Sequence, residues 1–425
     1  MSKLHTTTDF LTLYLHAQGE TEAPRVWHLW SGISLLAAAA QNRIYLMSPD
    51  GRMLYPNLYI MLIGGSGEGK GTSCEKTAIG QYVSPTVNYP YVYDKMHVLA
   101  GRYTMPAIYD YAKTCFPSEQ RGNMVLVENA AFWLVQEELA NGVGRDKGRV
   151  NAFIEGMTEL YDKVGSEGGD ATRTHGAVRF RNPCINWLTA TTEAWYLEVI
   201  GSKDLLSGFG ARIIQVFGRK DYDNPIPYDV LPPDVEIVKK YLRDRIAELV
   251  LSCGPIRYTP EAQEVYADWY RSRPKPDDES EKPVWNRIPV FSLKVAMITC
   301  LSRNEKVVSG GGETNWFLTP EDILEGVRLV ENVWATCLEK VQRHAASTPQ
   351  SRVVSIVGKI IERYTQKSGG VSHNVLMRRA NDYHGINAEA VRPVLAQLIS
   401  DQGLVAVEKR GHRLQDTFYK WKDAL

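Results

Sequence analysis

The hydrophobic pattern of this 425-residue chain changes character near residue 231. Before that point, short apolar runs such as "LYIMLIG", "AFWLVQEEL" and "CINWLTATT" alternate with helical stretches. Uninterrupted apolar runs of this length are typical of strands buried in a parallel sheet. After residue 231, helices with Pro- or Thr-led starts dominate, for example "TPEDILEGVRLVENVWATCLEKVQRH". The pattern predicts an α/β fold centred on a parallel sheet, followed by a helical region.

The same pattern divides the chain into four segments. We expect an N-terminal helical segment over residues 1–50, an α/β core over 51–230, a helical lid over 231–345 and a C-terminal module over 350–425. In the module, "SRVVSIVGKIIERYTQ", "SHNVLMRRAN" and "INAEAVRPVLAQLISDQG" predict three helices, and two β runs flank the basic turn "EKRGHR". This arrangement resembles a winged-helix domain.

Amino-acid composition limits the classes of protein to which this chain can belong. The chain is 44% hydrophobic and carries 49 basic and 49 acidic residues, so it is globular and is not a polycation. Its six cysteines show no CxxC spacing, which is typical of reduced thiols rather than of a disulfide framework or zinc site. The N-terminal residues lack the apolar core of a signal peptide, and no apolar run is long enough to cross a bilayer. We therefore expect a soluble, cytoplasmic protein.

A glycine-rich stretch, "LYIMLIGGSGEGKGTSCEKTAI" at residues 58–79, carries the first chemical signal. It meets the Gly-x-x-x-x-Gly-Lys pattern between an apolar strand and a helix, the context in which backbone amides cradle phosphates. Lys70 would neutralise the outer phosphates of ATP, and Thr72 or Ser73 would hold Mg²⁺. Gly71 stands where Ser or Thr is usual, a departure that resembles the GKGT ending of adenylate kinases. The candidate nucleotide-binding residues are Gly64, Gly65, Ser66, Gly67, Glu68, Gly69, Lys70, Gly71, Thr72 and Ser73.

A phosphate loop of this kind needs a carboxylate at the end of a neighbouring strand, to hold the metal and polarise water. "FWLVQEEL" supplies Glu137 and Glu138 after four apolar residues, and "MVLVEN" supplies the alternative, Glu128. We favour the pair, with Glu137 or Glu138 as base and the other near the metal.

Five motifs together resemble a known family. "YPNLYIMLIGGSGEGKGT", "VQEELANGVGRDKG", "FIEGMTELYD", "NPCINWLTATTEAW" and "GFGARIIQVF" occur in this order. They resemble phage- and prophage-encoded P-loop ATPases of the AAA+ type, including mobile-element helicases that look like minichromosome-maintenance proteins. The resemblance covers residues 5–345.

The resemblance implies roles for further residues. Thr191 or Thr192 would sense the terminal phosphate, although threonine is also common in strands. Arg212 would be an arginine finger reaching into the adjacent subunit of a hexameric ring, with a structural salt bridge as the alternative. Arg287 and Lys294 could be further cations near the phosphates, an inference from their position alone.

DNA contacts are expected at two places. A hairpin at residues 171–180 would face the pore of the ring and grip the DNA backbone through Arg173, His175 and Arg179, unless it is only a solvated surface hairpin. A second basic cluster, Arg145, Lys147 and Arg149, is more typical of an exposed loop. From residue 350 onward, 12 lysines and arginines face 7 acids, which suits DNA binding, with protein contact as the alternative. The candidate phosphate contacts of the module are Arg378, Arg379, Lys409, Arg410 and Arg413.

Together these features favour an ATP-hydrolysing DNA helicase or translocase for phage or mobile-element replication in a bacterial cytoplasm. Its partners would be DNA, further copies of itself and a primase or other replication protein. One rival is a replication initiator or helicase loader that uses the nucleotide as a switch. Another, suggested by the GKGT ending, is a nucleoside monophosphate kinase.

Overall fold

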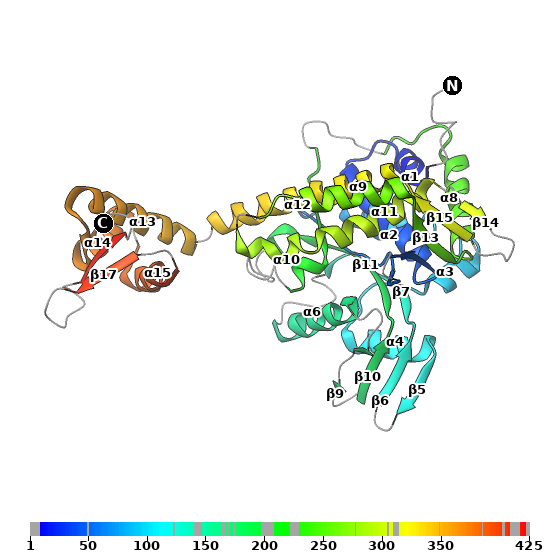
Figure 1. Ribbon diagram of the computed structural model, residues 1–425, viewed down its shortest axis with the longest axis horizontal. Helices are drawn as coiled ribbons and strands as arrows, with labels where there is room; N and C mark the ends of the chain where they lie inside the picture. Colours follow the sequence, from blue (N-terminus) through cyan, green and yellow to red (C-terminus); the bar gives the residue numbers. More distant parts are fainter. Residues whose placement is uncertain are drawn as a thin grey trace. The chain divides into compact units, whose positions relative to one another are not determined.

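The computed structural model describes residues 9–48, 51–121, 124–139, 147–162, 167–168, 171–172, 176–196, 208–221, 229–276, 278–303, 306–308, 314–347, 349–384, 386–401, 404–408 and 417–421. The chain divides into two compact units, Met1–Leu338 and Glu339–Leu425 (Figure 1). Each unit is described separately below.

A five-stranded parallel sheet forms the core of the first unit. Its strand order is β12 (Ile214–Phe217), β3 (Tyr59–Gly64), β11 (Cys184–Thr192), β7 (Ala131–Gln136) and β4 (Val98–Ala100). Every neighbouring pair is parallel, and β3, β7 and β12 are buried along their whole length. The prediction of an α/β fold with a parallel sheet is therefore confirmed.

The connections of this sheet diverge at its centre. After β3 the next strand of the sheet is β4 at one edge, whereas after β11 the next strand is β12 at the opposite edge. In open α/β sheets a crevice forms where connections from adjacent strands run in opposite directions, at the carboxyl ends of the strands. The glycine-rich loop begins at Gly64, the carboxyl end of β3, and therefore lies at this crevice.

Helix α2 (Arg25–Ala40) is buried almost completely against this sheet. Its Trp27 Nε1 donates to the carbonyl oxygen of Val216 in β12 at 3.1 Å, and its Ala37 carbonyl accepts a 3.2 Å bond from Asn186 in β11. Helix α1 (Phe10–Gln18) packs on α2 and begins at Asp9, whose carboxylate accepts from the Thr12 N–H at 2.7 Å. The segment predicted as an N-terminal helical element is thus part of the core.

A second, mixed sheet links distant parts of the chain. Its order is β14 (Lys306–Val308), β15 (Thr314–Leu318), β13 (Gly254–Tyr258), β1 (Ile44–Met47) and β2 (Met53–Leu54). Strands from residues 44 to 318 therefore share one sheet, so no separate compact unit begins at the predicted boundaries of residues 50 and 230.

The helices after residue 231 form where the pattern predicts them. They are α8 (Val235–Leu249), α9 (Pro260–Ser272), α11 (Ile288–Arg303) and α12 (Pro320–Ser347). Two short helices between α9 and α11, η4 (Glu279–Glu281) and α10 (Lys282–Trp285), are not predicted by the pattern. By length and composition, Lys282–Arg303 could cross a membrane, but 78% of the tested window is buried within the protein. Burial of this extent is what a core helix shows, so the segment is weak evidence for a membrane span.

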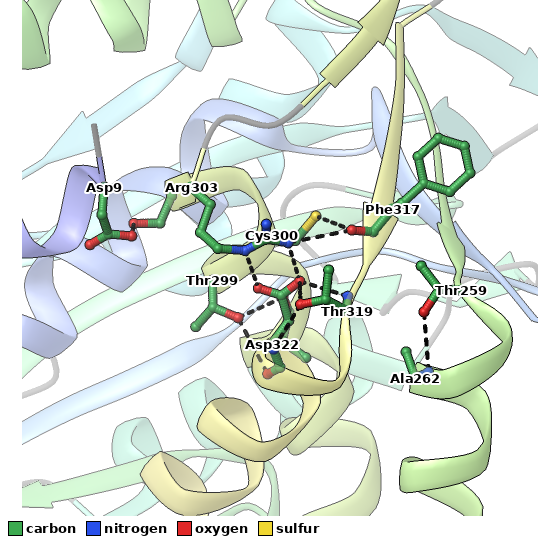
Figure 2. Close-up of polar contacts among 11 residues, drawn as sticks. Asp9, Thr259, Ala262, Thr299, Cys300, Arg303, Phe317, Thr319 and Asp322 are labelled. Atoms are coloured by element: carbon green, nitrogen blue, oxygen red, sulfur yellow. Dashed lines mark hydrogen bonds and ion pairs between the residues drawn. The ribbon is translucent and has the colours of Figure 1, made fainter. Parts of the chain in front are cut away.

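The start of α12 is fixed by a polar cluster (Figure 2). The Thr319 N–H donates to Asp322 Oδ2 at 2.9 Å, and Asp322, 2% exposed, also receives 2.8 and 2.5 Å bonds from the Arg303 guanidinium. A threonine N-cap with an acid three residues later satisfies backbone donors that a helix start leaves open. The pair Arg303–Asp322 joins the end of α11 to the start of α12.

A small sheet extends from the same unit beside β7, α4 (Met105–Cys115) and α6 (Lys147–Asp162) (Figure 1). It contains β5 (Ser118–Arg121), β6 (Met124–Glu128), β10 (Gly176–Arg181), β8 (Glu167–Gly168) and β9 (Ala171–Thr172). β9 pairs antiparallel with β10, so the two strands of the predicted hairpin are paired. The remaining elements of this unit are α3 (Pro90–Met96), η2 (Thr72–Ile79) and η3 (Gly210–Arg212).

The described residues of the second unit form three helices and a three-stranded antiparallel sheet. The helices are α13 (Pro349–Ser368), α14 (His373–His384) and α15 (Ala388–Asp401), and the sheet order is β16 (Val371–Ser372), β18 (Thr417–Trp421), β17 (Leu404–Glu408). Its core gathers apolar side chains from all three helices, including Val357, Leu376 and Val394.

Candidate functional site

The glycine-rich loop is held close to the sheet by α2. A Cβ placed on Gly64 would lie 2.5 Å from the Trp27 ring, so only glycine fits beside this tryptophan. Gly67 and Gly69 have φ values of +78° and +87°, a region in which side chains are strained. A Cβ on Gly69 would also lie 3.0 Å from Cβ of Ala23. Glycine is therefore required at these positions by the backbone conformation and by the close approach of α2.

Lys70 points back into this loop. Its ammonium group donates to the carbonyl oxygens of Gly64, at 3.1 Å, and of Gly65, and the residue is 6% exposed. Burial lowers the pKa of Lys70, and the nearby carboxylates of Glu138 and Glu68 act in the opposite direction. A lysine in this position is a concentrated positive charge at the carboxyl edge of the sheet.

Glu68 occupies the cradle of the loop. Its Oε2 accepts the Gly65 N–H at 2.6 Å, and the side chain is 7% exposed. A Cβ on Gly65 would lie 2.8 Å from the Glu68 carboxyl carbon. A carboxylate thus uses a backbone donor of the kind that binds phosphate in such loops.

The two candidate hydroxyls differ in environment. Ser73 is buried, and its Oγ lies 3.5 Å from Nε2 of His28 on α2, whereas Thr72 is only half-buried. Burial, followed by the charge of Arg25, lowers the pKa of His28 to about 4, so this imidazole is neutral near pH 7. The geometry leaves Thr72 as the hydroxyl with access to a ligand.

Both carboxylates of the favoured pair lie beside the loop. They follow β7, two strands away from β3 in the sheet, and a Cβ on Gly71 would lie 3.3 Å from Glu137 Oε1. Burial raises the pKa of Glu75, and the charge of Glu137 raises it further, so these two acids are also close. The proximity of Glu137 gives a steric reason for glycine after Lys70.

The alternative carboxylate lies in a different sheet. Glu128 ends β6 of the small sheet, where its Oε1 accepts a 2.7 Å bond from Arg181 of β10. It therefore forms a structural ion pair away from the loop.

The threonine strand β11 lies directly next to β3, and Thr191 and Thr192 are opposite Ile63 and Gly64. Thr191 is fully buried and its hydroxyl has no hydrogen-bond partner among the described residues. The Thr192 hydroxyl accepts a 3.4 Å bond from the Trp195 N–H. Thr191 therefore carries an unpartnered but buried hydroxyl, whereas Thr192 is half-buried opposite Gly64.

Arg212 lies at the opposite edge of the sheet. It precedes β12, in which Ile214 is opposite Ile60, so Arg212 is level with the amino end of β3, about 20 Å from Gly64 at the rise of a strand. Its guanidinium donates to the Gly208 carbonyl at 2.6 Å. An arginine here cannot reach the loop of its own chain.

Lys294 and Arg287 also lie at the amino edge. Lys294, 3% exposed, donates to Asn57 O and Oδ1, both at 2.8 Å, and to the Tyr161 hydroxyl at 3.1 Å. The Arg287 guanidinium lies 5.8 Å from the centroid of the Tyr161 ring. Because Asn57 precedes β3, the prediction that these cations approach the phosphates of their own subunit is wrong.

The candidate DNA contacts are described only in part. Arg179 is exposed on β10 and Arg378 is exposed on α14, while Arg379 is half-buried. Lys147 and Arg149 belong to α6. Outside the described residues lie Arg145, Arg173, His175, Lys409, Arg410 and Arg413.

The sequence does not predict the roles of three residues that shape the site. These are Trp27, His28 and Glu68, the last through its bond from the Gly65 N–H. The motif "RVWHLW" predicts a helix. Nothing in the motif indicates that its aromatic side chains contact a loop nearly 40 residues later in the chain. Among the described residues, no cluster of three or more His, Cys, Asp or Glu side chains forms a ready metal site.

The chain matches no protein-family model, and a search of curated proteins finds no match.

Proposed function

We propose that the first unit is a P-loop ATPase of the AAA+ type and that the protein is a DNA helicase or translocase of phage or mobile-element replication. The observation that carries the proposal is the convergence of Lys70, Glu137 and Glu138 on one glycine-rich loop at the carboxyl edge of a parallel sheet. Fixed cations and backbone donors in such a crevice suit a triphosphate.

The proposed chemistry assigns one role to each group. Backbone N–H groups of residues 65–71 and Lys70 would hold the phosphates, after displacing the Glu68 carboxylate. Mg²⁺ keeps several waters and needs only one or two protein ligands besides phosphate, so Thr72 and one acid suffice. The remaining acid of Glu137 and Glu138 would orient and deprotonate the attacking water.

The placement of Arg212 supports assembly into an oligomer as part of the proposal. An arginine about 20 Å from its own loop can stabilise the departing phosphate only in a neighbouring copy of the chain. Head-to-tail contacts of this kind form a ring when the rotation between copies closes, and we propose a homo-oligomer, with a hexamer as the expected form.

DNA is the proposed substrate of the motor. Support comes from the paired strands β9 and β10, with Arg179 exposed on β10, and from the excess of basic residues after residue 350. Under this proposal the second unit is a winged-helix domain that holds DNA, and a primase or other replication protein would act beside it in a bacterial cytoplasm.

One assay separates the proposal from its rivals. Phosphate release from ATP is measured with and without single-stranded DNA, alongside the mass of the protein in the presence of nucleotide. The motor predicts DNA-stimulated hydrolysis by an oligomer. A nucleotide-switched initiator or loader predicts tight nucleotide binding with little turnover on DNA. A nucleoside monophosphate kinase predicts phosphate transfer to a monophosphate and indifference to DNA.

A further inference from the structure

Helix α13 of the second unit carries a row of cations on its outer face. Lys359, Arg363 and Lys367 are exposed, are spaced four residues apart and form no ion pair with another described residue. Residues four apart lie on one face of a helix, and the three span about 12 Å along its axis. We call these three residues the α13 basic stripe.

The packing of α13 fixes the direction of this stripe. Val353, Val357 and Ile361 face the core of the unit and are almost fully buried. Lys359 and Arg363 each follow a core residue by two positions, which is a rotation of about 200° around the helix. The stripe therefore points away from the core, into solvent.

Ordinary helix physics does not account for the whole stripe. Lys367 in the last turn is favourable beside the negative end of the helix. Lys359 and Arg363 lie further in, where like charges four residues apart destabilise a helix, and the exposed Glu362, three residues after Lys359, offsets this repulsion only in part. Three exposed cations against one exposed acid leave this part of α13 with a positive excess, which suits a polyanionic partner.

The third helix of the unit offers much less charge. Among its exposed, described residues, α15 and the turn before it present one cation, Arg392, and one acid, Glu389. The rest of this face is neutral, with Pro393, Ala396 and Ile399 exposed. A helix with this surface is poorly suited to a DNA backbone, which carries one negative charge per 1.7 Å.

We infer that the second unit contacts the phosphate backbone of DNA along α13 (Figure 1), through Lys359, Arg363 and Lys367, rather than through the outward face of α15. This inference rests on the proposed DNA-dependent function and specifies the surface that the DNA follows. Contacts of this kind are independent of base sequence, because they are made to phosphates.

The test is the salt dependence of DNA binding by the full-length chain without nucleotide. Binding of fluorescein-labelled duplex DNA is measured by anisotropy between 50 and 200 mM KCl for the wild type and for the triple variant K359Q/R363Q/K367Q. A matched control, K240Q/R271Q/R328Q, removes three exposed cations from the first unit. A fourth protein, R392Q, changes α15.

Each phosphate contact contributes about 0.9 to the slope of log affinity against log salt. The inference predicts that the triple variant loses two to three from this slope and binds at least tenfold more weakly at 100 mM, while the control and R392Q stay near wild type. If the triple variant does not fold, judged by circular dichroism, K359Q and R363Q are each expected to lose about one from the slope.

The possible outcomes test the α13 basic stripe and the proposed ATPase motor separately. Unchanged slopes in the stripe variants, or a loss in R392Q as large as in the triple variant, would overturn the inference and leave the stripe as a protein-binding or solvated face. A wild type that binds DNA with the predicted dependence on the stripe but hydrolyses no nucleotide would contradict the motor alone.

Discussion

Two buried lysines of the first unit lie at opposite edges of the same sheet. Lys294, at the amino edge, gives its three donors to Asn57 O, Asn57 Oδ1 and the Tyr161 hydroxyl. Among the described residues, Lys70 at the carboxyl edge donates to carbonyl oxygens of its own glycine-rich loop and has the carboxylates of Glu138 and Glu68 nearby. Both residues are less than 7% exposed. Burial is therefore common to both lysines, and they differ in their partners and in the edge of the sheet at which they lie.

The comparison predicts its largest effect at the acids beside Lys70. Glu138→Gln and Glu137→Gln should each lower ATP hydrolysis, and the one that removes the general base should do so by about 100-fold or more. Nucleotide binding should persist, because the loop and Lys70 are intact. Phosphate release and binding of a fluorescent ATP analogue measure the two properties.

Glu128→Gln is the matched control for these variants, because Glu128 pairs with Arg181 in the small sheet. Its hydrolysis should stay within about twofold of wild type, as expected for a surface ion pair. A loss of hydrolysis in Glu128→Gln equal to that in Glu138→Gln would contradict the assignment of different roles to the acids of the two sheets.

At the amino edge we expect an effect on stability instead. Lys294→Met leaves the Asn57 and Tyr161 oxygens buried without their donor and should lower the free energy of unfolding by about 3 kcal/mol. Urea denaturation measures the change, and nucleotide affinity per folded molecule should be unaltered. Tyr161→Phe, which removes one of the three acceptors, should cost about 1 kcal/mol. Loss of nucleotide binding in folded Lys294→Met would contradict the structural role.

The next effect concerns His28, which joins α2 to the helix after the loop. Its pKa is lowered from 6.5 to about 4, so folding favours the neutral imidazole. The contribution to stability is full above pH 6.5 and is lost as the pH falls toward 4, by about 2 kcal/mol between pH 7 and pH 4.5. His28→Gln should remove this part of the pH dependence in urea titrations, and an unchanged profile would count against the buried neutral state.

The smallest expected effect lies at the start of α12, far along the chain from the loop. Thr319→Ala removes the N-cap hydroxyl of the cluster in Figure 2 and should cost about 1 kcal/mol in unfolding free energy. Hydrolysis per folded molecule should not change. A drop in turnover with unchanged stability would show that this region communicates with the loop.

Local signals account for what the sequence predicts correctly. Each correctly predicted element has a signal within about 20 residues of sequence. An apolar run predicts the strand Cys184–Thr192, a glycine pattern predicts the loop after Tyr59–Gly64, and Pro- or Thr-led starts predict the helices after residue 231. The favoured acids follow from the same logic, because the end of a buried strand must lie at an edge of the sheet.

Long-range packing accounts for what the sequence does not predict. In the mixed sheet, Ile44–Met47 pairs with Gly254–Tyr258. The sequence pattern of neither segment predicts which strand it will pair with. Arg287 and Lys294 were expected near the phosphates from chain position, yet the packing of α11 places Lys294 beside Asn57 at the far end of β3. Trp27 gains its role only when α2 packs against the loop. The contact of Glu68 with the Gly65 N–H is local, but the glycine pattern carries no signal for it.

The most direct test of the account is the nucleotide response of Lys70→Ala beside Lys240→Ala, an exposed lysine of α8. Titration with Mg²⁺–ATP and measurement of phosphate release should show at least tenfold weaker binding and about 100-fold slower turnover for Lys70→Ala, with Lys240→Ala like wild type. Full affinity and full turnover in folded Lys70→Ala would contradict the claim that this loop binds the reacting phosphates.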